Sequence, residues 1–303
     1  MKLPKALAAF AAVLAVSFLE SAPPHAELTV VTSTSDLAAI AREVGGDLVS
    51  AESIAAGTQD PHFVELLPSH MIRVRKADVY VKVGMDLDYW AQAIIDGSRN
   101  AKLEIVDASS TVPIETRLEV PTRVDASLGD VHKFGNPHYW LDPENGKRIA
   151  RAIADGLERA DPANAARYEA GYESFVKRLD GKIAAWKQAA APLRGMKVVT
   201  YHRSWPYFTR AFGIEVVGYL EPKPGVKPSP THVAEVIAQI RAQKVSALAY
   251  EPYFEKRTPE MIARETGIPL VVLPPSVGGV PEVQDYFGLF DYNLAALARV
   301  APK

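Results

Sequence analysis

Short apolar runs alternate with segments of helical spacing in the first part of the chain. Leu28–Ser33 is an apolar, β-branched run that predicts a buried strand. Leu37, Ile40 and Val44 then recur at helical spacing until Gly45. The alternation continues with a strand at 49–54, a helix at 70–76, a strand at 77–83 and a helix at 87–95. Strands that alternate with helices predict parallel β-α-β units.

The alternation returns in the last third of the chain. Apolar spacing there predicts strands at 196–201, 215–219, 247–250 and 270–273, and helices at 205–212, 231–243, 259–267 and about 283–299. The stretch 111–133 lacks a clear period and predicts a surface loop. The expected fold class is therefore α/β, with two parallel-sheet lobes.

A long amphipathic helix is predicted between the two halves. Apolar residues recur there at three- and four-residue steps with charged residues between them: Tyr168, Tyr172, Phe175, Val176, Leu179, Ile183 and Trp186. Pro192 marks the end of the helix. We therefore expect an N-terminal lobe over 27–161, a rigid linking helix over 162–191 and a C-terminal lobe over 192–303.

Residues 1–26 have the pattern of a secretory signal peptide. Lys2 and Lys5 precede an apolar run, Ala6–Leu19, that is short for a membrane span, and small residues follow it. Cleavage is expected after Ala22 or Ala26. An uncleaved membrane anchor is the alternative, but we expect an exported, soluble protein.

The composition excludes several classes of function. The chain has 34 Lys and Arg against 36 Asp and Glu, and this balance does not favour nucleic acid as a partner. It has no cysteine, which rules out disulfides, thiolate metal sites and a lipid-modified cysteine. Export without cysteine fits a periplasmic protein that is not a lipoprotein.

Three of the histidines share one kind of position. His62 follows the strand predicted at 49–54, His138 lies in an Asn-Pro-His sequence, and His202 follows the strand predicted at 196–201. In parallel α/β sheets the ligand crevice lies at the carboxyl ends of the strands. A single loop histidine is more often structural than a ligand, but three in matching positions predict a metal site between the lobes.

The chain resembles the periplasmic solute-binding proteins that deliver zinc or manganese to ABC transporters, the zinc-uptake and TroA-like family. The resemblance covers nearly all of the chain after residue 27. It is carried by Asp60-Pro61-His62, Asn136-Pro137-His138-Tyr139-Trp140-Leu141-Asp142-Pro143, Tyr201-His202 and Glu251-Pro252. The family implies two lobes bridged by a rigid helix, with one metal ion at their interface and no enzymatic activity.

The resemblance also implies three histidine ligands and one carboxylate. His62, His138 and His202 match the histidine positions. Asp285, at an acidic-aromatic start of the last helix, is our choice for the carboxylate, and Glu251 is the alternative. Asp60, Asn136, Asp142 and Glu251 are candidates for orienting the imidazoles, or else for helix caps and surface groups.

The ligand set favours Zn²⁺, one ion per chain, over Mn²⁺, which prefers more oxygen. The long His-rich loop of many zinc-specific members is missing here, and only His132 could serve as an auxiliary ligand; His70 and His232 are expected to lie on the surface. The expected partner of this monomer is a membrane permease, with a zinc metallochaperone as a possible further one. A manganese or iron carrier, a zinc hydrolase and an adhesin are the competing functions.

Overall fold

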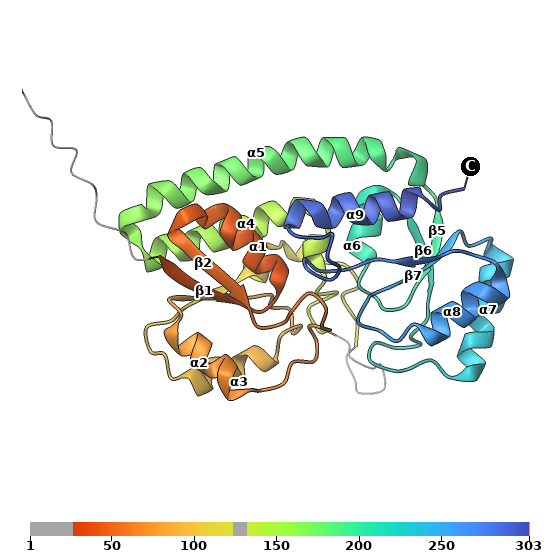
Figure 1. Cartoon of the computed structure of the whole chain (residues 1–303), viewed down its shortest axis with the longest axis horizontal. Coiled ribbons are helices and arrows are strands. Elements are labelled where there is room, and N and C mark those ends of the chain that lie inside the picture. The colour runs from red at the N-terminus through yellow and green to blue at the C-terminus, as the bar shows by residue number, and fades with distance from the viewer. Residues whose placement is uncertain (1–26, 124–131, 303) are drawn as a thin grey trace, which may run out of the picture.

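The computed structural model describes residues 27–123 and 132–302, so the predicted signal peptide and residues 124–131 of the predicted surface loop lie outside them. Two α/β lobes stand side by side beneath one long helix (Figure 1). Within the described part of the chain, no helix is both long and apolar enough to span a bilayer.

The first lobe is built on a four-stranded parallel sheet. Its strand order is β2-β1-β3-β4, with β1 at Leu28–Thr32, β2 at Val49–Ser53, β3 at Val79–Lys82 and β4 at Glu104–Asp107. One face packs on α1 (Ser35–Gly45) and α4 (Pro143–Ala160), and the other on α2 (Pro68–Lys76) and α3 (Trp90–Ser98). Val30 and Val31, neighbours on β1, belong to different apolar clusters because successive side chains of a strand point to opposite faces.

The second lobe repeats this plan. Its order is β6-β5-β7-β8, with β5 at Lys197–Thr200, β6 at Glu215–Tyr219, β7 at Ala247–Tyr250 and β8 at Leu270–Val272. One face packs on α7 (Pro230–Gln243) and α8 (Arg257–Thr266), and the other on α6 (Pro206–Phe212) and α9 (Tyr286–Ala298). The prediction of two parallel-sheet lobes is confirmed.

Two elements of the first lobe were not predicted. The edge strand β4 is short and leaves Ile105 44% exposed, so it lacks the apolar run that identifies a buried strand. Helix α4 buries Ile149, Ile153 and Leu157 at four-residue spacing. It connects the segment that carries His138 to the long helix.

The linking helix α5 runs from Ala165 to Ala189, a span of 25 residues. At 1.5 Å per residue it is roughly 37 Å long, enough to extend over both lobes (Figure 1). Arg178 pairs with Glu43 of α1, whereas Trp186 donates to Asp291 of α9 at 2.7 Å. The helix is therefore fixed to both halves.

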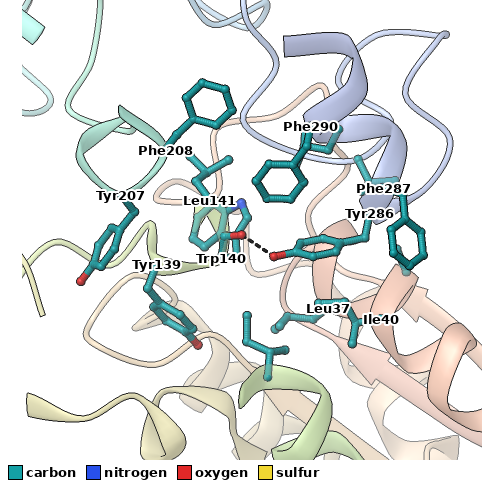
Figure 2. Close-up of a cluster of buried hydrophobic side chains, with 14 of the residues drawn as sticks. Leu37, Ile40, Tyr139, Trp140, Leu141, Tyr207, Phe208, Tyr286, Phe287 and Phe290 are labelled. Carbon is teal, nitrogen blue, oxygen red and sulfur yellow. Dashed lines mark hydrogen bonds between the residues drawn. The ribbon is translucent and has the colours of Figure 1, made fainter. Parts of the chain in front are cut away.

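The two lobes share one apolar core rather than meeting across a hinge. Aromatic residues from both sides pack together at the junction (Figure 2): Tyr139, Trp140, Tyr207, Phe208, Tyr286, Phe287 and Phe290. The Tyr286 hydroxyl donates to the Trp140 carbonyl at 2.6 Å, and Trp140 Nε1 donates to the Pro275 carbonyl at 2.8 Å. Opening such an interface would expose much apolar surface, so we expect small lobe movements.

Two glycines of α5 provide a test of this packing. A Cβ on Gly171 would lie 2.0 Å from the Val44 carbonyl oxygen of α1, whereas a Cβ on Gly181 meets nothing within 4 Å. Gly171→Ala should destabilise the protein by about 1–3 kcal/mol, because the two helix backbones must separate. Gly181→Ala should stabilise it by ~0.5–1 kcal/mol through helix propensity. Urea unfolding of both variants checks this, and equal shifts for the two would contradict the close approach of α5 to α1.

Candidate metal centre

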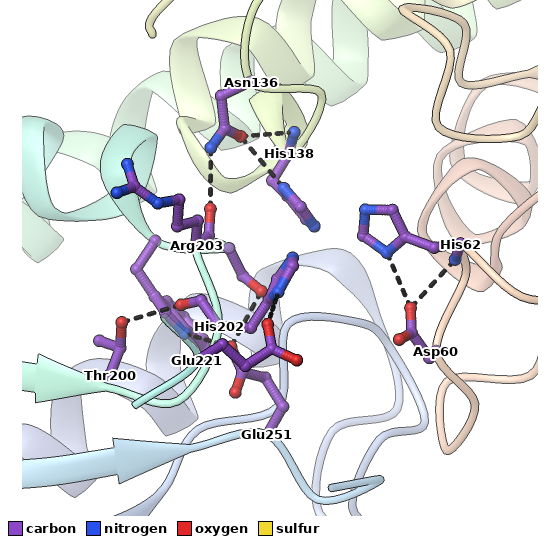
Figure 3. A network of polar contacts seen from close by, with 11 residues as sticks. Asp60, His62, Asn136, His138, Thr200, His202, Arg203, Glu221 and Glu251 are labelled. Atoms are coloured by element: carbon purple, nitrogen blue, oxygen red, sulfur yellow. Dashed lines mark hydrogen bonds and ion pairs between the residues drawn. The ribbon is translucent and has the colours of Figure 1, made fainter. Parts of the chain in front are cut away.

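Three histidines from three loops converge at the carboxyl ends of the two sheets (Figure 3). His62 lies between β2 and α2, His138 precedes the short helix that leads into α4, and His202 follows β5. The centroid of the His62 ring lies 5.1 Å from that of His138 and 5.2 Å from that of His202. All three residues are at most 5% exposed, and one nitrogen from each lies within 4.8 Å of the others.

His62 and His138 are oriented by the same local device, an Asp or Asn two residues earlier. Asp60 Oδ1 accepts from the backbone N–H of His62 at 3.0 Å and contacts its ring Nδ1 at 2.7 Å. Asn136 Oδ1 accepts from the backbone N–H of His138 at 3.0 Å and contacts its Nδ1 at 3.1 Å. The proline between the two residues fixes φ, so this Asx turn holds the ring in place.

His202 is oriented by a residue that sequence reasoning missed, Glu221. Its Oε2 lies 2.6 Å from His202 Nδ1, and both side chains are buried. Glu221 follows β6, the parallel neighbour of β5, so the two residues leave the sheet at the same edge. The sequence signal that could have identified Glu221 is an acidic residue two positions after the strand predicted at 215–219.

The hydrogen bonds determine which ring nitrogen can bind a metal. The Asn136 amide donates to Arg203 O at 2.8 Å, so its oxygen faces the imidazole and accepts from Nδ1–H of His138. Carboxylates of Asp60 and Glu221 likewise accept from Nδ1–H. The Nε2 lone pairs are therefore left available, and Nε2 of His62 and of His138 are buried without a hydrogen-bond partner among the described residues. Buried lone pairs of this kind fit a bound cation.

The electrostatics around the rings favour a neutral His138 and an ionised Asp60. Burial, together with the nearby His62 and His202, holds the pKa of His138 well below its usual range. Burial opposes ionisation of Asp60, but the hydrogen bonds and charge of His62 outweigh it and lower the pKa of Asp60. The two carboxylates behind the rings can balance the charge of a divalent ion.

The structure does not bring Asp285 to the histidines. Its carboxylate caps α9, accepting from the Gly288 N–H at 2.7 Å, and the residue is exposed in a surface depression beside Arg178 and Lys182. An acidic residue before a helix satisfies the free N–H groups of the first turn, and this is the role Asp285 has here. The expectation that Asp285 would approach the imidazoles therefore has to be revised.

The two other acidic candidates support the surrounding structure. Glu251 is fully buried, and its Oε1 accepts from Ser204 and Trp205 at 2.9 Å, which secures the loop after His202. Burial raises the pKa of Glu251 to about 8, so this group is largely protonated at neutral pH. Asp142 caps α4 and pairs with Arg210.

Replacing Glu221 with glutamine should weaken metal binding by about 10–100-fold, because the neutral amide orients His202 without raising its basicity. Competition with a chelator of known affinity measures the change. Glu235→Gln is the matched control, since Glu235 pairs with the partly exposed His232. An unchanged affinity in Glu221→Gln would show that this carboxylate does not support a ligand.

Comparison with known proteins agrees with this geometry. The family model described as zinc-uptake complex component A, periplasmic (ZnuA), matches residues 30–300. The chain belongs to the ZnuA family. It is accordingly a metal-binding, substrate-binding protein of an ABC transporter rather than an enzyme.

Two curated relatives and one solved structure illustrate the similarity within the ZnuA family. The metal ABC transporter substrate-binding lipoprotein FimA of Streptococcus parasanguinis is 28% identical, with 98% of each chain covered. The manganese ABC transporter substrate-binding lipoprotein PsaA of Streptococcus pneumoniae is 26% identical, covering 90% of this chain and 88% of that protein. A zinc-bound ZnuA deletion mutant superimposes with a TM-score of 0.78 at 25% identity, covering 92% of this chain and 99% of that one.

Proposed function

We propose that this protein captures one Zn²⁺ through His62, His138 and His202 and delivers it to the permease of an ABC transporter. The observation that carries the proposal is the orientation of the rings. Each ring Nδ1 faces an oxygen acceptor. The Nε2 atoms of the three histidines are therefore available to bind one metal ion between the lobes.

The donor set favours zinc over manganese as the cargo. The three residues of the group all offer imidazole nitrogen, a donor that suits Zn²⁺, whereas Mn²⁺ favours oxygen ligands. The nearby carboxylates of Asp60 and Glu221 are turned toward ring Nδ1 atoms. Several relatives are named for manganese, and a manganese-binding function is therefore the alternative to be tested.

The expected location follows from the N-terminal sequence. Residues 1–26 are proposed to direct export and to be removed, which would release a monomeric protein into the periplasm. The curated relatives are named lipoproteins, but this chain has no cysteine to carry a lipid. A permease, and a metallochaperone that loads the site, are the proposed partners.

Parallel titrations of the metal-free mature protein with Zn²⁺ and Mn²⁺ test the proposal. We expect one Zn²⁺ per chain and an affinity for Zn²⁺ at least about 100-fold above that for Mn²⁺. This direction agrees with the general order in which protein sites bind divalent first-row metals. Preferential Mn²⁺ binding would assign the protein to manganese uptake. Absence of binding by either ion would overturn the metal-carrier function.

A further inference from the structure

A fourth imidazole lies beside the three that we propose as zinc ligands. The centroid of the His132 ring is 5.3 Å from that of His62, with an angle of 35° between the ring planes. His132 also lines a cavity of about 300 Å³ together with His138 and His202. It is partly buried.

The backbone near His132 is fixed to the segment that carries His138. The Gly135 N–H donates to the His132 carbonyl at 3.2 Å, and the Asn136 N–H donates to the Leu118 carbonyl at 2.7 Å. Gly135 has φ of +99°, and a Cβ there would lie 2.7 Å from the Leu118 oxygen. This tight turn places His132 at the site.

The acidic side chains near the four imidazoles have hydrogen-bond partners of their own. Asp60 and Glu221 bond to ring Nδ1 atoms. Glu119, which lines the cavity, accepts from Asn136 at 2.9 Å through Oε2 and from Arg203 at 3.2 Å through Oε1. Zinc bound by three protein ligands keeps a fourth tetrahedral position, and each of these carboxylates already has a hydrogen-bond partner other than the ion.

We propose that His132 fills this position, so that the ion is held by four imidazole nitrogens and no carboxylate. The inference rests on the zinc-binding function proposed above. Coordination by His132 requires a rotation of its side chain. The His132 ring contacts the His62 ring, but its nitrogens are not among the three that cluster within 4.8 Å of one another. A site with nitrogen donors alone would discriminate against Mn²⁺ more strongly than a site of three imidazoles and a carboxylate.

X-ray absorption at the zinc edge and competition titrations test the fourth ligand. Wild-type protein should show four imidazoles around zinc, and His132→Ala should show three imidazoles with an oxygen ligand and an affinity at least about tenfold lower. His232→Ala is the matched control, since this histidine lies on α7 and bonds to the Tyr219 carbonyl.

The outcomes separate this inference from the proposed function. Three imidazoles in wild-type protein, or an unchanged zinc affinity in His132→Ala, would overturn the role of His132 and leave the zinc carrier intact. Failure of the wild-type protein to bind zinc would overturn both.

Discussion

His138→Ala should abolish tight zinc binding, with a loss of affinity of more than about 1,000-fold. Removal of a residue that only orients a ligand typically costs about 10–100-fold, and a nitrogen bonded to the ion contributes more. His138 is 2% exposed, and its Nε2 is buried without a hydrogen-bond partner among the described residues. Competition titration near pH 7.5 measures the loss.

Two controls distinguish loss of the ligand from loss of the fold. His232→Ala should keep the wild-type affinity, because that side chain lies on α7 away from the cluster. Urea unfolding without metal should show that His138→Ala still folds cooperatively. A folded His138→Ala protein that binds zinc as tightly as wild type would refute the three-histidine centre.

Two members of the histidine cluster were predictable from the strand topology. His62 and His202 follow strands whose carboxyl ends face the lobe junction, a property of parallel sheets that the apolar pattern already implies. The roles of Asp60 and Asn136 were also predictable from the local sequence, because each acceptor lies two residues before the histidine ring that it orients.

Long-range partners were not predictable in this way. Glu221 is 19 residues from His202, and their contact depends on the pairing of β5 with β6. Asp285 shows the converse problem, because an Asp that caps a helix and an Asp that binds a metal have the same local sequence. The edge strand β4 was missed because its exposed Ile105 interrupts the apolar pattern of a buried strand.

The fold supports a preformed site. The lobes share an apolar core. Helix α5 forms an ion pair with Glu43 in the first lobe and a hydrogen bond with Asp291 in the second. The imidazoles are already oriented by Asp60, Asn136 and Glu221, so little ordering is left for the metal to induce. Preorganisation of this kind raises affinity by reducing the entropy lost on binding.

Zinc affinity should fall by at least about tenfold between about pH 7.5 and pH 5.5, because imidazole is the side chain that takes up protons in this range. The metal binds only the neutral ring, so protons compete with it and the affinity decreases as the pH falls. Burial holds the pKa of His138 well below its usual range, so that ring remains neutral and adds nothing to the competition.

The response to pH also depends on the carboxylate beside His62. The lowered pKa of Asp60 keeps this group ionised across the range, so its hydrogen bond to His62 Nδ1 persists while zinc is displaced. Zinc titrations at several pH values measure the loss of affinity. An affinity that stays unchanged down to strongly acid pH would contradict a site built from imidazoles, because even a buried ring takes up a proton there.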